Sequence, residues 1–371
     1  MSKLERLIQE HCPNGVPFKK VSEVANVSIG EFVHKSKQNQ NGKYPVFNGG
    51  TSNTGFYDEY NRTANKIIIS ARGANAGFVN RVFTNYWSGN SCYTIDVVDK
   101  NLNWTFVYYW FKQNEQVLLG EQQKGGIPAV SKKQVENFPI PVPPIEVQSE
   151  IVRILENFTK LTAELTAELT VRKKQYSELS YQLLIQKNTA NKCSIKDLCD
   201  VTKGKSPIQK SEPGEYPLVV TTSERKSCNT YQYDAAAVCI PLVSSRGHGV
   251  ASLNHVYYQE GKFALGNILC AVVPKDENIL SAKYLYFYFE CTKDYTLVPL
   301  MKGGANVSMH IPDIEKVKIP VPNIETQQSI VSKLEVLDEY CNITLPAEIE
   351  ARQKQYEYYR EKLLNFKEMS E

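Results

Sequence analysis

Few residues of this 371-residue chain have types and spacings that could support catalysis or metal binding. Gly204-Lys205-Ser206 ends like a phosphate-binding loop, but Cys199 stands where that loop needs its first glycine. The five histidines show no HExxH motif or other metal-ligand spacing, and the nine cysteines include no CxxC pair. No G-x-S-x-G elbow is present, and no G-x-G-x-x-G follows a strand. The sequence therefore predicts a binding protein with no catalytic residue, no metal site and no cofactor.

The composition is that of a folded protein with a nearly balanced charge. Hydrophobic residues make up 42% of the chain, and 43 basic side chains face 40 acidic ones. Any nucleic-acid surface must then be local or shared with a partner. The odd cysteine count argues against a disulfide framework. The first twelve residues carry no apolar signal segment, and no apolar run is long enough to span a membrane. We therefore expect a cytoplasmic protein that makes no membrane contact.

The clearest signal in the sequence is an internal repeat at an offset of about 179 residues. Ile140-Pro-Val-Pro143 recurs as Ile319-Pro-Val-Pro322, and Arg172-Lys-Lys-Gln-Tyr176 recurs as Arg352-Gln-Lys-Gln-Tyr356. Upstream, Lys124-Gly-Gly126 matches Lys302-Gly-Gly304. So many matches in one order favour a duplication over two unrelated helices of similar composition.

A long helix is predicted after each proline-rich motif, the first starting near Ile145. The apolar residues of this first helix alternate in steps of four and three, which is typical of a coiled coil. They are Ile151, Leu155, Phe158, Leu165, Leu169, Tyr176, Leu179 and Leu183. The simplest arrangement pairs the two helices antiparallel, with one globular domain at each end of the rod.

Two features interrupt the predicted helical seam. Arg172 and Arg352 occupy the same seam position in both copies, which suggests control of register or a contact with a partner. The second copy gains one residue near Pro346, so we expect a break or kink between Asn342 and Pro346.

Each globular half mixes short strands with one aromatic helix. Lys66–Ser70 and Ala237–Val243 read as strands, whereas Trp104–Leu119 and Ala282–Tyr295 have helical length and an aromatic stripe that suits a core. The predicted fold class is α+β, with a pseudo-twofold internal repeat. The expected parts are an N-terminal helix (1–16), a first domain (17–138), a first spacer helix (139–188), a second domain (189–317) and a second spacer helix (318–371).

The proline-rich motifs carry a family resemblance. The stretch Pro139-Ile-Pro-Val-Pro-Pro-Ile145 leading to Gln148 and a long helix resembles the conserved regions of specificity subunits from Type I restriction–modification systems. The copy at Ile319–Gln327, the lead-in Ser131-Lys-Lys133 and the opening His11-Cys-Pro-Asn-Gly-Val16 resemble that family as well. The match covers essentially the whole chain, and its duplicated order is the specific part.

This resemblance implies two target recognition domains that each read one half of a bipartite, asymmetric double-stranded DNA site. It also implies a non-catalytic scaffold for DNA adenine methyltransferase subunits, in two copies, and in some systems for motor-nuclease (restriction) subunits. Two rival interpretations stay open: a specificity subunit of a Type IIB system, paired with one fused methylase–nuclease, and a coiled-coil scaffold with no DNA role.

The duplication also sorts the candidate DNA-binding residues. Residues shared by both copies should contact phosphates or support the fold, since phosphate contacts carry no sequence information. These residues are Arg72, Arg246, Lys124 and Lys302. Base contacts are expected where the copies differ: Asn75 against His248, and Asn48 and Asn53 against Thr221, Thr222 and Arg225. The alternative for each is a turn residue that caps its own backbone.

A short helix is predicted at the N-terminus. Ser2-Lys-Leu-Glu5 has the form of a capping box, and Leu4, Leu7 and Ile8 follow on one face. We expect this helix to pack beside the far end of the second long helix, near Leu363 and Phe366.

Overall fold

The computed structural model describes residues 3–119, 127–187, 189–209, 211–245, 253–304 and 306–369. The chain forms two compact units. The first contains Met1–Glu164 and Ile349–Glu371, and the second contains Leu165–Glu348.

An antiparallel sheet of order β2-β8-β5-β6 lies at the centre of the first unit. Its strands are β2 (Ala25–Ile29), β8 (Cys92–Val97), β5 (Lys66–Ser70) and β6 (Val79–Val82). On β5, Ile67 and Ile69 belong to the main core, whereas Ile68 packs with Val82 and Tyr86 in a separate cluster. Successive side chains of a strand point to opposite faces. Both faces of β5 are therefore covered, which explains its uninterrupted apolar run and confirms the predicted strand.

Smaller strand groups flank this sheet. A three-stranded group has the order β4-β3-β7, and β1 pairs with β9. The elements are β4 (Gly55–Tyr57), β3 (Tyr44–Phe47), β7 (Trp87–Ser88), β1 (Phe18–Lys20), β9 (Pro139–Pro141), α2 (Val21–Val24), η1 (Lys35–Lys37) and α5 (Lys132–Glu136). Lys19 lies opposite Ile140 in the β1–β9 pair. The proline-rich motif is thus anchored to the domain by backbone hydrogen bonds.

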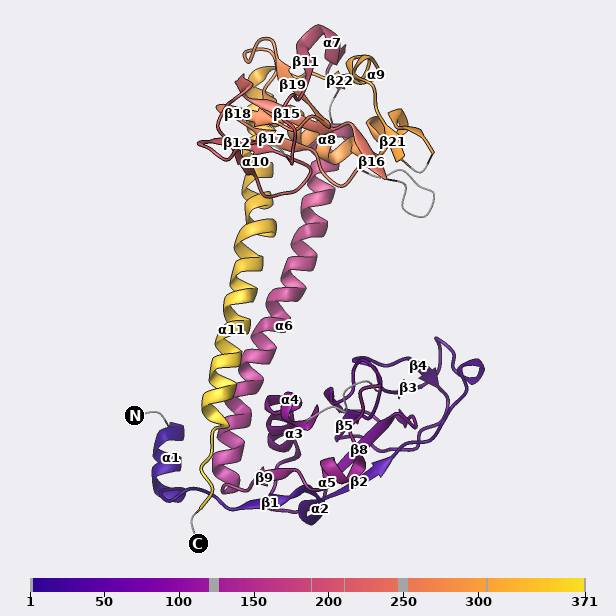
Figure 1. The fold of residues 1–371 in the computed structure, drawn as a ribbon, viewed down its shortest axis with the longest axis vertical. Helices are drawn as coiled ribbons and strands as arrows, with labels where there is room; N and C mark the ends of the chain where they lie inside the picture. The colour runs from indigo at the N-terminus through magenta and orange to yellow at the C-terminus, as the bar shows by residue number, and fades with distance from the viewer. Residues whose placement is uncertain are drawn as a thin grey trace. The chain divides into compact units, whose positions relative to one another are not determined.

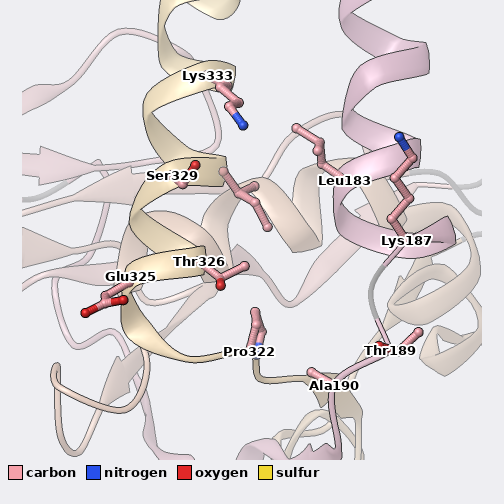
Figure 2. A pocket seen from close by; sticks show the side chains of 10 residues that line it. Leu183, Lys187, Thr189, Ala190, Pro322, Glu325, Thr326, Ser329 and Lys333 are labelled. Atoms are coloured by element: carbon pink, nitrogen blue, oxygen red, sulfur yellow. The ribbon is translucent and has the colours of Figure 1, made fainter.

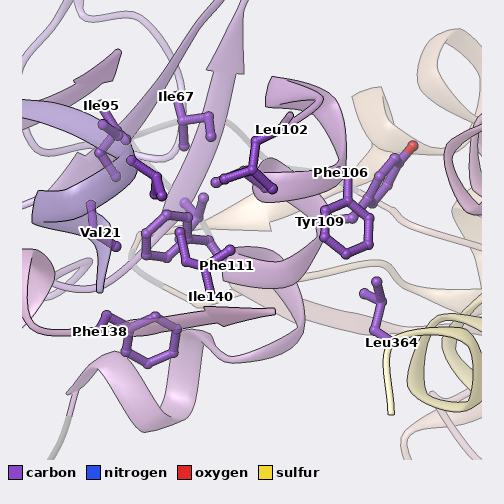
Figure 3. Close-up of a cluster of buried hydrophobic side chains, with 14 of the residues drawn as sticks. Val21, Ile67, Ile95, Leu102, Phe106, Tyr109, Phe111, Phe138, Ile140 and Leu364 are labelled. Atoms are coloured by element: carbon purple, nitrogen blue, oxygen red, sulfur yellow. The ribbon is translucent and has the colours of Figure 1, made fainter. Parts of the chain in front are cut away.

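The aromatic helix of the first domain forms part of its core, as the sequence predicts. α3 (Trp104–Gln113) begins after Asn103, whose side chain accepts a hydrogen bond from the backbone N–H of Thr105, and α4 (Glu115–Leu119) follows. Phe106 and Phe111 are fully buried, and the ring of Phe111 stacks on that of Phe138 at 5.4 Å between centroids. Figure 3 shows these rings gathered beneath the sheet.

Two long helices pair antiparallel within the first unit. α6 (Ile145–Tyr181) begins there and α11 (Leu345–Leu363) ends there. Leu155, near the start of α6, shares a core with Leu364, which follows α11. Further along, the ring of Phe158 stacks on that of Tyr359, with centroids 5.3 Å apart.

The N-terminal helix α1 (Lys3–His11) packs where predicted, beside the end of α11 (Figure 1). Leu4 is buried in the core that contains Leu364, with Leu363 and Phe366 packed against it. Beyond α1, the backbone N–H of Val16 donates to the carbonyl of Lys367 at 2.9 Å. Ser2, the predicted cap, lies outside the described residues.

The second unit repeats the main sheet of the first. The order is β11-β19-β15-β17, again antiparallel. Its strands are β11 (Cys199–Lys203), β19 (Leu269–Pro274), β15 (Ala237–Pro241) and β17 (Tyr257–Gln259). The predicted strand Ala237–Val243 is wrong in its last part. β15 ends at Pro241, and Val243 begins β16 (Val243–Ser245). Leu242 between them donates to the carbonyl of Ile268, beside β19, but accepts from the N–H of Met309, beside β21, so the chain passes from one strand group to another here.

Three further strand groups and several helices complete the second unit. The strand groups are β13 (Lys226–Cys228), β12 (Tyr216–Val219), β18 (Lys262–Leu265) and β14 (Tyr233–Asp234); β16 (Val243–Ser245), β21 (Asn306–Ser308) and β20 (Lys302–Gly303); and β10 (Lys192–Ser194) with β22 (Lys318–Pro320). The helices are η2 (Gln182–Gln186), α7 (Ile195–Leu198), α8 (Ala282–Thr296), η3 (Val298–Leu300), α9 (Ile311–Glu315), α10 (Ile324–Glu339) and η4 (Tyr340–Thr344).

The long helices also pair antiparallel within the second unit. Leu184, just after α6, shares a core with Ile330 and Leu334 on α10. Toward the other end of α10, the hydroxyl of Tyr340 donates to Glu168 at 3.2 Å. The predicted antiparallel pairing is therefore confirmed in each unit. The placement of one domain at each end of the rod stays a prediction.

The predicted break near Pro346 is a π-helical turn instead. α10, η4 and α11 follow one another directly, and η4 is π-helical. A π turn holds an extra residue, so it absorbs the one-residue gain of the second copy without ending the helix. Pro346 then lies at the second residue of α11, directly after the π turn.

The two seam arginines bond along their own helices in the same way. The Nη1 atom of Arg172 donates to Oε1 of Gln175 at 3.0 Å, and that of Arg352 donates to Oε1 of Gln355 at 3.0 Å. The contact of these arginines with a partner stays a prediction.

Both domains have a glycine at the same point of close backbone contact. A Cβ on Gly30 would lie 2.1 Å from the carbonyl oxygen of Ser88, and one on Gly204 would lie 2.2 Å from that of Gly266. No side chain fits at either position, so the shared glycines maintain the same close backbone approach.

The copies differ at the start of the second long helix. Ser329 and Lys333 on α10 take the places of Glu150 and Ile154, on the part of α6 near which α1 packs. In the second unit this face lines a groove of about 540 Å³ together with Leu183 (Figure 2). Ser329 and Lys333 accordingly replace a buried carboxylate and an apolar side chain that lie near α1 in the first unit.

Candidate nucleic-acid interface

Loops of the first domain bring several predicted DNA-binding residues to one edge of its sheets. The loop after β3 contains Asn48 and Asn53, and the loop after β5 contains Arg72 and Asn75. The hydroxyl of Ser70, at the end of β5, donates to the carbonyl of Gly50 at 3.2 Å. The two loops are thus fastened to each other.

Arg72 and Asn75 are exposed on a tightly folded loop. Gly73 and Gly77 have φ angles of +91° and +80°, a region that favours glycine. The N–H of Gly77 donates to the carbonyl of Ser70 at 2.8 Å and closes the loop. The guanidinium of Arg72 makes no hydrogen bond or ion pair with any residue that the structure describes. Its charge is therefore available to a ligand.

The two asparagines of the β3–β4 loop are used within the protein. The Oδ1 atom of Asn48 accepts from the backbone N–H of Ser91 at 3.1 Å. The Nδ2 atom of Asn53 donates to the carbonyl of Gly55 at 3.3 Å. The Asn53 contact matches the alternative of a turn residue that caps local backbone, whereas the Asn48 contact joins the loop to a segment distant in sequence. Neither side chain is fully buried.

The side chain of Arg225, a predicted base contact, is hydrogen-bonded within its own domain. Its Nε donates to Oε1 of Gln259 at 3.0 Å, and its Nη2 donates to the carbonyl of Tyr258 at 3.1 Å. The guanidinium also lies 5.3 Å from the ring centroid of Tyr257. These contacts fix the loop after β12 to β17. Among its neighbours, Thr221 is exposed and Thr222 donates to the carbonyl of Glu224.

Lys302 pairs with an acidic residue of its own domain. Its Nζ lies 3.1 Å from Oδ2 of Asp313. Lys302 and Lys316 together hold the pKa of the Asp313 carboxyl below its usual value by hydrogen bonding. The side chain of Lys302 is still 68% exposed, so it retains access to solvent. Lys124, Arg246 and His248 lie outside the described residues, and their roles stay predictions.

The backbone pairing corrects the alignment of Arg72 with Arg246. Ala71 and Leu242 follow equivalent strands, and each donates and accepts one backbone hydrogen bond of 2.8 Å to matching segments of its own domain. The residue after Leu242 is Val243, so Val243 takes the structural place of Arg72. Arg246 comes three residues later in the sequence. The match of Arg72 with Arg246, at a difference of 174 in residue number, fails because the second domain has more residues between the two equivalent strands.

Sequence reasoning missed two exposed lysines of the first domain. Lys35 and Lys37 lie on η1. The segment that follows η1 joins β4 through the N–H of Asn39, which donates to Phe56 at 2.9 Å. In the sequence, the two lysines are marked only by their spacing, with one serine between them in a polar stretch. The repeat could not reveal them because the second copy does not preserve the pattern.

Several kinds of function find no support in the described part of the chain. It contains no group of three or more His, Cys, Asp or Glu side chains that could hold a metal ion. None of its helices is long and apolar enough to cross a membrane. The structure has two similar domains whose exposed loops differ.

Comparison with known proteins accounts for this duplicated architecture. A family model described as the Type I restriction modification DNA specificity domain matches twice, at residues 13–171 and 188–351. The chain therefore belongs to the family of DNA specificity subunits of Type I restriction–modification systems. The expected Type I assignment is confirmed, and the Type IIB and DNA-free alternatives gain no support.

Individual relatives agree with the family match. The chain is 34% identical over 294 residues to the specificity subunit of the Type I restriction enzyme EcoR124I/EcoR124II from Escherichia coli, covering 70% of each chain. It is 28% identical over 397 residues to a putative Type I restriction enzyme specificity subunit from Haemophilus influenzae, covering 98% of each. The crystal structure of a Type I restriction–modification S subunit from M. genitalium has the same fold, with a TM-score of 0.65 at 18% identity over 96% of this chain and 98% of that one.

Proposed function

We propose that each globular domain reads one half of a bipartite, asymmetric DNA site, and that the paired helices set the distance between the halves. The recognition domains are residues 17–138 and 189–317. The observation that carries this proposal is the difference between the copies. Gly30 and Gly204 hold the same backbone contact, while the loops after β5 and β15 differ in length and sequence. Two domains with a common fold and different loops are suited to recognising two different DNA sequences.

Within the first domain, Arg72 contacts a phosphate and Asn75 reads a base. Arg72 has a fixed charge without a partner among the described residues, which suits a phosphate contact. Asn75 is exposed two residues before Gly77 on the same closed loop. An asparagine can make a bidentate contact with adenine in the major groove. Asn48 and Asn53 instead hold the loop in shape for these contacts.

The chain acts as a non-catalytic scaffold in the assembled system. It brings two methylase subunits, and restriction subunits where the system includes them, to the DNA site. Its net charge of +3 gives little general attraction for DNA, and affinity for DNA depends on the number of phosphates that basic side chains neutralise. Partner subunits that enclose the duplex then supply the remaining phosphate contacts.

Reconstitution with the cognate methylase subunit tests this function. We expect sequence-specific methylation only when this chain is present, and no methyl transfer by the chain alone. The isolated chain should bind DNA weakly, with affinity that falls steeply as salt is added. Nanomolar, sequence-specific binding by the isolated chain at physiological salt would contradict the shared-surface proposal.

A further inference from the structure

An arginine fills the crevice between domain and long helix in the first unit. The guanidinium of Arg81 on β6 forms an ion pair with Glu156 on α6. It also lies 4.7 Å from the ring centroid of Tyr108 and 5.4 Å from that of Tyr109, both on α3. Only 12% of the Arg81 side chain is exposed. The crevice thus holds a cation between a carboxylate and two aromatic faces.

The second unit has the same crevice with Lys283 of α8 beside it instead of an arginine, and the Nζ atom of Lys283 lies 5.6 Å from the ring centroid of Tyr258. Arg81 lies opposite Ile67 on β5, and Tyr258 lies opposite the equivalent Val238 on β15. Tyr286 and Phe287 on α8 stand where α3 has its two tyrosines. The result is a cavity of about 540 Å³ lined by these three rings and by α10.

The α10 side of this cavity carries an excess of negative charge. Glu335 is the counterpart of Glu156 and pairs with Lys283 at 2.6 Å. Asp338 and Glu339, however, stand where the first copy has Thr159 and Lys160. A cavity that receives an arginine in one copy is therefore more acidic in the other.

Asp338 is a half-buried carboxylate without a cation. It accepts hydrogen bonds from Nδ2 of Asn342 at 2.9 Å and from the hydroxyl of Tyr176. No cationic side chain in the described part of the chain pairs with it. Burial raises the pKa of its carboxyl. A buried carboxylate is costly unless a positive charge offsets the loss of water, so this site favours a cationic ligand.

We infer that this cavity binds the guanidinium of an arginine supplied by a methylase subunit. This inference rests on the proposed scaffold function. The planar guanidinium can stack on tyrosine rings while it hydrogen-bonds a carboxylate, as Arg81 does in the first unit; a lysine ammonium lacks that planar shape.

The mouth of the cavity favours a protein over a small free cation. Val336 and Ile343 line it and are 67% and 65% exposed. Apolar side chains beside a half-buried charged group are typical of an interface, where an anchoring residue enters and neighbouring apolar contacts exclude water.

Asp338→Asn in the full chain tests the inference. The amide retains an oxygen that can accept hydrogen bonds but loses the negative charge. The dissociation constant for the cognate methylase subunit should rise at least about tenfold. The melting temperature of the free chain should stay the same or rise, since an uncompensated carboxylate is removed. Glu325→Gln, an exposed residue of α10 outside the cavity, is the matched control and should change neither quantity.

Each outcome decides the question. Assembly of Asp338→Asn with wild-type affinity overturns the inference, whereas failure of the wild-type chain to assemble overturns the proposed scaffold function. An arginine-to-alanine scan of the methylase subunit should find one substitution that weakens assembly with the wild type but adds nothing to Asp338→Asn. If arginine amide raises the melting temperature of the wild type while no such arginine is found, the ligand is a small cation and the partner assignment is wrong.

Discussion

Gln148 and Gln327 lie at the same position of the two long helices and make the same three hydrogen bonds. In each copy the amide nitrogen donates to a proline carbonyl of the preceding motif and to a carbonyl before the aromatic helix, and the amide oxygen accepts from the N-cap residue of that helix. The partners, at 2.6–2.9 Å, are Pro143, Asn101 and Asn103 for Gln148, and Pro322, Ile279 and Ser281 for Gln327. Both glutamines are fully buried.

These glutamines should be essential for docking each helix to its domain. Gln148→Leu leaves one N–H and two carbonyls without their partner, so we expect the free energy of unfolding to fall by about 2–4 kcal/mol. Urea denaturation measures the loss, and amide exchange should accelerate around residues 101–103. Gln353→Leu, at an exposed helical position, should change stability by less than about 0.5 kcal/mol. Equal effects of the two substitutions would show that the buried bonds are unimportant.

The stability of the first unit should depend on pH through Glu150. Arg153, and then Lys3, hold the pKa of this carboxyl at about 2, below its ordinary value of 4.5. A lowered pKa in the folded chain adds stability above pH 4.5 that is lost as the pH falls toward 2. Melting temperatures between pH 6 and pH 2 should therefore fall more steeply for the wild type than for Glu150→Gln. Glu146→Gln, at an exposed neighbouring position, should retain the wild-type slope; parallel curves for all three chains would refute this.

Helix α1 should stabilise the first unit through its apolar face. Leu4 is 4% exposed in the core that includes Leu364. Leu4→Ala should lower the free energy of unfolding by about 2–4 kcal/mol, and deletion of residues 1–10 should lower the melting temperature further. Glu10→Ala, on the exposed side of α1, is the control. An unchanged melting temperature after the deletion would show that α1 is not part of the fold.

Arg72 and Asn75 should respond differently to alanine substitution. In the assembled complex, Arg72→Ala should weaken binding to all DNA sequences and reduce the slope of log affinity against log salt by about 1. Asn75→Ala should leave the slope unchanged and relax base preference at one position, at a cost of about 1–3 kcal/mol for the preferred site. Binding titrations at several salt concentrations distinguish the two. A change of base preference in the Arg72 variant would contradict its assignment to a phosphate.

The sequence predicted the elements that depend on periodicity and repetition. The strand Lys66–Ser70 and the start of α6 at Ile145 follow from local pattern, and the antiparallel seam follows from the repeated helix. Exact loop equivalence did not follow, because Val243 takes the place of Arg72 in the backbone ladder, although Arg246 matches it in residue type. Nor could pattern show that Asn48 and Arg225 are bonded within the protein, since those bonds join segments distant in sequence. The π turn at Tyr340–Thr344 was visible only as one extra residue.

The two domains are proposed to read separate halves of the DNA site. Mapping of N6-methyladenine in DNA modified by the assembled complex tests it most directly, using the wild type and a chain whose residues 17–138 are replaced by those of a relative. The wild type should methylate a bipartite motif, and the exchange should alter one half while the other half and the gap stay the same. A continuous motif, or an exchange that alters both halves, would contradict the claim.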